Sequence, residues 1–174
     1  MTKTVLQFAL MFVVLVIAQS VIFNHIALFN VALAFIFIYF ILRLPVTLST
    51  GKVIALSFMI GFCVDIFSDT PGINSLACTC LGGTRLTVIR LYVPREEDVN
   101  RNQPSIRSLG AAVYAKYVLT MSLIFCTLVF MIEALSFFNF PNMLMRIGAS
   151  TLLTSALLFA ADSLTYRSAS EKRL

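Results

Sequence analysis

Two carboxylates four residues apart, Asp65 and Asp69, are the groups in this chain best placed to do chemistry. They stand at the far end of the apolar run of residues 53–67, where a membrane helix would leave the bilayer. Because a charged side chain within a membrane is costly unless it is hydrated or paired, acids in this position indicate a polar site. Their spacing also places them on one helix face, which would suit a carboxylate dyad or a cation site.

The residues that follow fit a turn equally well. Pro71 and Gly72 end the predicted helix just beyond the two acids, and Asp69-Thr-Pro-Gly is common turn chemistry. We therefore expect Asp69 to lie in a turn. Asp65 is deeper in the span, and we expect it to make a structural or partner-facing polar contact rather than to act in catalysis.

A third acid, Glu133, closes the apolar run of residues 111–135, and Arg146 lies near the start of the run of residues 143–164. The connection between these runs is short, which brings the two helix ends together as an antiparallel pair. Pairing lowers the cost of a charge in a membrane. We expect Arg146 to lie close to Glu133, which leaves Asp65 free for a polar network within the bundle or for a partner.

No further reactive constellation is visible in the sequence. It contains no Gly-x-Ser-x-Gly elbow, no His-x-x-His or Glu-x-x-His pair and no glycine loop of the phosphate-binding kind. The four cysteines fall inside apolar segments far from the single histidine, His25, so neither a zinc site nor a disulfide framework follows. We expect a protein that is not an enzyme, with no catalytic residues, no cofactor and no metal.

The composition indicates an integral membrane protein. Hydrophobic residues make up 59% of the 174 residues and charged residues only 12%, whereas a soluble domain has about 25% charged residues. The net charge of +5 comes from basic residues that sit between apolar runs and form no extended patch. They fit orientation in the membrane better than nucleic-acid binding.

Six apolar runs predict six transmembrane helices in a single integral membrane domain. The run nearest the N-terminus is long and lacks a small-x-small cleavage site, so we interpret it as a retained span and not a signal peptide. The fourth is the weakest because small polar residues interrupt it, which leaves open a helix with a close-packed interface or a re-entrant element. The runs lie near residues 5–23, 26–42, 53–67, 73–93, 111–135 and 143–164.

The distribution of lysine and arginine predicts the orientation. With six spans, both termini lie on one side, and nearly all the basic residues fall on that same side, which is typical of the cytoplasmic face. The polar stretch of residues 95–107 is then a cytoplasmic loop, either solvated or a docking surface. The basic residues on this face are Lys3, Arg43, Lys52, Arg90, Arg95, Arg101, Arg107, Lys116, Arg167, Lys172 and Arg173.

The stretch of residues 60–72, Ile-Gly-Phe-Cys-Val-Asp-Ile-Phe-Ser-Asp-Thr-Pro-Gly, resembles the central motif of the rod shape-determining protein MreD family. The likeness extends over nearly the whole chain. It includes the outer turn Phe23-Asn-His-Ile, the basic exit that begins at Arg90, the loop Pro104-Ser-Ile-Arg, Glu133 and the basic tail.

This resemblance implies a non-catalytic component of the bacterial inner membrane that binds the single-span protein MreC. Through MreC it helps to couple MreB filaments to peptidoglycan synthesis by RodA and an elongation transpeptidase. It also implies a six-helix fold similar to the substrate-binding subunits of energy-coupling-factor transporters, and a vitamin-type binding subunit of such a transporter is the alternative function. The candidate residues for partner binding or for structural polar contacts are Gly61, Asp65, Asp69, Pro71, Gly72, Glu133 and Arg146.

Overall fold

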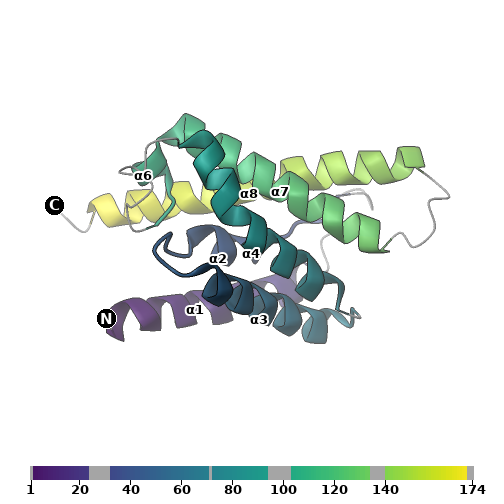
Figure 1. Cartoon of the computed structure of the whole chain (residues 1–174), viewed down its shortest axis with the longest axis horizontal. Coiled ribbons are helices and arrows are strands. Elements are labelled where there is room, and N and C mark those ends of the chain that lie inside the picture. The colour runs from purple at the N-terminus through teal and green to yellow at the C-terminus, as the bar shows by residue number, and fades with distance from the viewer. Residues whose placement is uncertain (1, 24–31, 71, 94–102, 134–139, 172–174) are drawn as a thin grey trace.

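The computed structural model describes the chain except for residues 1, 24–31, 71, 94–102, 134–139 and 172–174 (Figure 1). Within the described residues, the regular secondary structure is helical and contains no β-strand, which agrees with the predicted all-α class. The elements are α1 (Thr2–Ala18), the π-helix η1 (Gln19–Phe23), α2 (Ile38–Arg43), α3 (Thr50–Ser68), α4 (Ile73–Tyr92), α6 (Ile106–Leu109), α7 (Ala111–Glu133) and α8 (Phe140–Glu171).

Among the residues that the structure describes, three helices are long and apolar enough to cross a membrane, namely Thr50–Ser68, Ala111–Glu133 and Pro141–Thr165. The first helix and its π-helical continuation add a shorter apolar stretch, Leu6–Ile22. A span needs about 20 mostly apolar residues, so these lengths support the assignment to a membrane.

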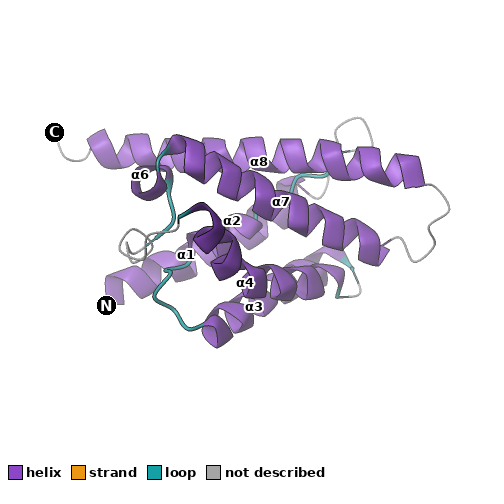
Figure 2. Ribbon diagram, turned by 45° about the horizontal axis from the view of Figure 1, so that its top comes forward, coloured by secondary structure: helices purple, strands orange, loops and turns teal. Residues whose placement is uncertain are grey.

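Helices α3 and α4 pack together as an antiparallel hairpin, and α7 packs against both α4 and α8 (Figures 1 and 2). Helix α1 begins and α8 ends at the same end of the molecule, which we call the tail end. At the opposite end, the hairpin end, α3 turns into α4, α7 ends and α8 begins. This placement of the first and last helix ends is what an even number of crossings requires.

The fourth predicted span is a continuous helix, α4, and not a re-entrant element. The small residues within it allow close packing. A Cβ atom added to Gly82 would lie 2.5 Å from the hydroxyl of Ser57 on α3. Gly82 therefore lies at the close interface of the α3–α4 hairpin.

The second predicted span, residues 26–42, is not a continuous helix, and here the prediction was wrong. Residues 26–31 lie outside the described part, residues 32–37 are non-helical, and only Ile38–Arg43 forms a helix, α2. An irregular backbone survives within a membrane protein only where other groups of the protein meet its hydrogen-bonding needs. Side chains of neighbouring helices do so here, as described below.

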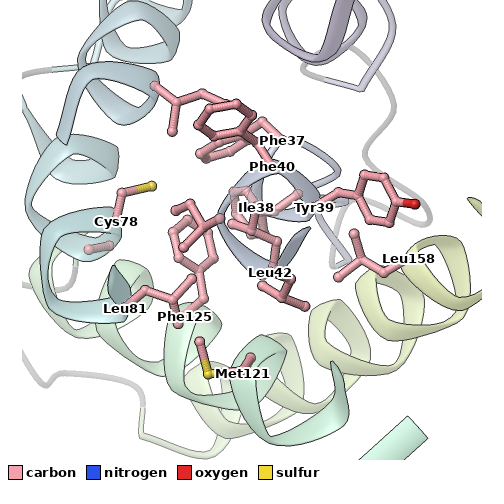
Figure 3. Packing of buried hydrophobic residues seen from close by; sticks show 14 of the residues in the cluster. Phe37, Ile38, Tyr39, Phe40, Leu42, Cys78, Leu81, Met121, Phe125 and Leu158 are labelled. Carbon is pink, nitrogen blue, oxygen red and sulfur yellow. The ribbon is translucent and has the colours of Figure 1, made fainter. Parts of the chain in front are cut away.

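Short as it is, α2 lies at the centre of the bundle (Figure 3). Five of its six residues are buried, and they cover every side of the helix. A helix that is apolar all round is stable only when it is enclosed by other elements. The rings of Phe35 and Phe37, which precede α2, pack edge-to-face against Phe125 of α7 at 5.1 and 5.6 Å.

Candidate functional site

Asp65 lies in the last turn of α3, is 4% exposed and faces the first turn of α4. Its Oδ1 accepts hydrogen bonds from the backbone N–H of Asn74 at 3.0 Å, from the Asn74 side-chain amide at 3.0 Å and from the Thr70 hydroxyl. Its Oδ2 accepts from the backbone N–H of Ser75 at 2.8 Å and from the Ser75 hydroxyl. All five donors are electrically neutral.

These bonds make Asp65 the cap of α4. The first N–H groups of a helix have no partner within it, and a carboxylate there also interacts favourably with the helix dipole. The N-cap residue of α4 itself, Gly72, has no side chain that could serve. The side chain of Asp65 therefore holds the two helices of the hairpin together, a structural polar contact.

The structure separates the two acids that the sequence placed on one helix face. Asp69 ends α3 in the left-handed conformation at φ 54°, with its side chain exposed. Aspartate is among the few residues that adopt this conformation readily. Gly72 follows at φ 80°, where glycine carries no steric penalty, while Pro71 lies outside the described residues. Asp65 and Asp69 thus form no dyad.

Gly61 lies one turn before Asp65, at the closest approach of the hairpin. A Cβ atom there would stand 2.6 Å from the carbonyl oxygen of Asn74 and 2.7 Å from the Cα atom of Ser75. Backbone atoms cannot move aside as a flexible side chain can. The glycine thus allows the approach that brings Asp65 within hydrogen-bonding distance of α4.

The expected pairing of Arg146 with Glu133 does not form an ion pair, although Arg146 does lie against the end of α7. Among the described residues, the salt bridge found is between Arg43 and Asp162. The guanidinium of Arg146 instead lies 4.9 Å from the centre of the Phe130 ring, one turn before the end of α7. A flat guanidinium stacks well on an aromatic face. Glu133 is exposed, so water can solvate its charge.

Asp162 of α8 is a buried acid that the sequence analysis missed. It is 2% exposed and lies at the tail end. Its Oδ1 contacts Arg43 at 2.9 Å and accepts a hydrogen bond from the Tyr39 hydroxyl at 3.0 Å. Its Oδ2 accepts from the backbone N–H of Ile106, the first residue of α6, at 2.8 Å. One carboxylate therefore joins α2, α6 and α8.

The same face of α8 supports the irregular backbone before α2. Ser150 Oγ accepts a hydrogen bond from the Leu33 N–H at 3.0 Å, and Thr154 Oγ1 accepts from the Phe35 N–H at 3.2 Å. Both lie on the helix face that carries Asp162, because residues four apart align on a helix.

Gln19 of η1 completes this support from the other side. Its side-chain amide donates to the Ala34 carbonyl at 3.0 Å and accepts from the Ile36 N–H at 3.0 Å. The N–H groups of Leu33, Phe35 and Ile36 and the carbonyl of Ala34 are thereby satisfied without a helix.

The sequence contains a pattern that indicates this buried face of α8. Four buried positions of α8 follow each other at intervals of four, and three of them are polar: Ser150, Thr154, Leu158 and Asp162. Such a polar stripe on a membrane helix indicates a face turned toward protein.

A third buried charge, Arg85 of α4, is fully enclosed. Its guanidinium donates a hydrogen bond to the carbonyl of Leu44, the C-cap residue of α2. A cation is favourable at the C-terminus of a helix, where carbonyl groups lack partners. Three buried charges thus each meet a helix end, Asp65 at α4, Arg85 at α2 and Asp162 at α6.

A pocket of about 150 Å³ lies at the hairpin end. Its walls come from η1, the 32–37 segment, the α3–α4 turn and the end of α7, and its polar wall residues include Asn74 and Glu133. Of the residues that the structure describes, no three His, Cys, Asp or Glu side chains gather as metal ligands do.

Comparison with known proteins adds no assignment, because no family model, curated protein or solved structure matches this chain.

Proposed function

We propose that this protein is a non-catalytic scaffold of the bacterial cell-elongation machinery in the inner membrane, with six transmembrane spans. In this role it binds an MreC-like single-span protein, and through it MreB, RodA and an elongation transpeptidase. The proposal comes from the resemblance of residues 60–72 to the central motif of the MreD family. The structural support is that the buried charges, Asp65 of this motif together with Arg85 and Asp162 of the bundle core, are engaged in joining helices.

The hydrogen bonding of Asp65 is the observation that favours a binding role over a catalytic one. Asp65, the acid best placed for chemistry, already accepts five hydrogen bonds from the hairpin. A general base or nucleophile needs a free lone pair within reach of a substrate. The motif instead builds a rigid helix hairpin, which suits a surface for a partner helix.

The tail end faces the cytoplasm in this proposal. Exposed Lys52 and Arg90 lie there, at the start of α3 and the end of α4. In a cysteine-free background, a cysteine at position 52 should resist an impermeant thiol reagent in intact cells, and a cysteine at position 69 should react. The reverse pattern would refute the orientation.

The function is tested by depletion and by purification from native membranes. Depletion should make rod-shaped cells round or swollen, and the protein should co-purify with an MreC-like single-span protein. Co-purification with an ATPase pair and its membrane coupler, with normal cell shape on depletion, would favour the vitamin-type transporter subunit. The pocket at the hairpin end is the observation that supports this alternative function as a transporter subunit.

A further inference from the structure

Two irregular features meet the first turn of α4 at the pocket of the hairpin end. Gln19 belongs to the π-helix η1, Leu33 and Phe35 belong to the non-helical 32–37 segment, and Asn74 lies in the first turn of α4. π-helical turns occur frequently at functional sites. Non-helical backbone at membrane depth is tolerated where it is buried in protein or lines a cavity, and broken helices of transporters build their binding sites in this way.

Asn74 provides an unused hydrogen-bond acceptor in the wall of this pocket. Its side chain is 7% exposed, and its Oδ1 has no hydrogen-bond partner among the described residues. Its amide nitrogen donates to Asp65 and to the Thr70 hydroxyl, which determines which way the amide points. Donation to a carboxylate polarises the amide and makes its oxygen a stronger acceptor. A buried acceptor calls for a donor, and the described part of the chain does not supply one to Asn74 Oδ1.

The charge around the pocket is negative. Glu133 lines it with a carboxylate that pairs with no cation among the described residues, because Arg146 lies over Phe130. Asp65 stands behind Asn74 and is held by neutral donors. The apolar part of the wall includes the rings of Phe35 and Phe37, whose faces attract cations.

We propose that this pocket binds a primary ammonium group, with Asn74 Oδ1 as hydrogen-bond acceptor and Glu133 as counter-ion. An ammonium offers three N–H donors and a positive charge, which match the free acceptor and the negative surroundings. A cavity of about 150 Å³ holds a molecule the size of benzene, so a pocket of about 150 Å³ admits an alkylammonium of a few carbons. The group belongs either to a small soluble amine or to the headgroup of an aminophospholipid.

The test is calorimetric titration of the purified full-length protein in phosphatidylcholine and phosphatidylglycerol nanodiscs with n-propylammonium chloride. Binding should saturate. Tetramethylammonium, a cation without N–H donors, should bind several-fold more weakly, because each lost hydrogen bond costs about two- to tenfold in affinity. Equal affinity for the two cations, or no saturable binding of n-propylammonium, would overturn the proposal.

Two exposed acids at the hairpin end provide a matched pair of variants. Glu133→Gln keeps the shape of the pocket and should weaken n-propylammonium binding about two- to fivefold, as expected for a partly exposed charge pair. Asp69→Asn removes an acid that does not line the pocket and should leave the affinity unchanged. Equal effects of the two variants would show that only the general negative charge of this end matters.

The acceptor is tested without altering the fold. In ¹⁵N-labelled protein, the side-chain amide resonance of Asn74 should shift as n-propylammonium saturates the pocket, and that of exposed Asn142 should not. Unchanged Asn74 resonances at saturation would place the binding elsewhere and overturn the proposal.

The source of the ammonium group is distinguished by lipid composition. Replacing phosphatidylcholine by phosphatidylethanolamine should raise the apparent Kd for n-propylammonium if a lipid headgroup occupies the pocket, and leave it unchanged if the ligand is a soluble amine. Either result supports the site and identifies its source. This inference is independent of the proposed scaffold role, because co-purification with a single-span partner does not require the pocket to be filled.

Discussion

The two ends of the bundle each bury an acid, and they stabilise it by different means. At the hairpin end, Asp65 accepts hydrogen bonds from five neutral donors and has no cation partner among the described residues. At the tail end, Asp162 forms a salt bridge with Arg43 and accepts two further hydrogen bonds. The first arrangement strengthens a local turn, and the second ties together segments that are remote in the sequence.

This difference affects what each acid contributes to stability. Removing Asp65 leaves neutral donors without an acceptor, and some of these can turn toward water at the membrane surface. Removing Asp162 leaves a largely buried guanidinium without its counter-ion, which costs more than a lost neutral hydrogen bond. The tail end should therefore be more sensitive to loss of its acid than the hairpin end.

The largest effect is expected from Asp162→Ala. It leaves Arg43 unpaired and removes the acceptor of Tyr39 and of Ile106, so the free energy of unfolding should fall by about 3–5 kcal/mol. Unfolding with sodium dodecyl sulfate in mixed micelles measures this. Adding Arg43→Ala should recover part of the loss, and strictly additive losses would contradict the ion pair.

A smaller effect is expected from Asp65→Ala. Loss of hydrogen bonds to a charged acceptor should lower the free energy of unfolding by about 1.5–3 kcal/mol in the same assay. It should also weaken co-purification of the single-span partner. Asp69→Ala is the matched control, because an exposed acid in a turn should contribute within about 0.5 kcal/mol. Equal tolerance of both changes would show that Asp65 is merely solvated.

The close approach of the hairpin is tested by Gly61→Ala. The added Cβ would meet backbone atoms of α4, so we expect a loss of about 1–3 kcal/mol in the free energy of unfolding. Gly148→Ala on α8 is the control, because a Cβ there has open space and alanine should stabilise the helix by up to about 1 kcal/mol. Destabilisation of similar size at both positions would argue against a specific contact at Gly61.

The smallest effect is expected from Glu133→Lys. An exposed acid without a paired cation should contribute less than about 1 kcal/mol to the free energy of unfolding. Arg146→Glu should not rescue the variant, because the Arg146 guanidinium packs on Phe130. Recovery of stability in the double variant with Glu133→Lys and Arg146→Glu would indicate that these two side chains form the ion pair that the sequence suggested.

Much of the α3–α4 hairpin could be predicted because its signals are local. Asp65 lies within ten residues of its donors Asn74 and Ser75, and Asp69 and Gly72 adopt the left-handed conformations that turn residues tolerate. The partner of Arg146 does not follow from charge alone, because the nearby Phe130 ring competes with Glu133 for its guanidinium.

The all-helical class, the membrane character and the turn between α3 and α4 follow from the amino-acid sequence, because they depend on composition and on neighbours along the chain. Two features follow only from contacts in the folded protein. Residues 32–37 are non-helical, and Asp162 is the second buried acid. The partners concerned are 117 to 123 residues apart, from Leu33 to Ser150 and from Tyr39 to Asp162. A backbone N–H is free to leave its helix only when packing brings another acceptor to it, and no local pattern reports which remote side chain that will be.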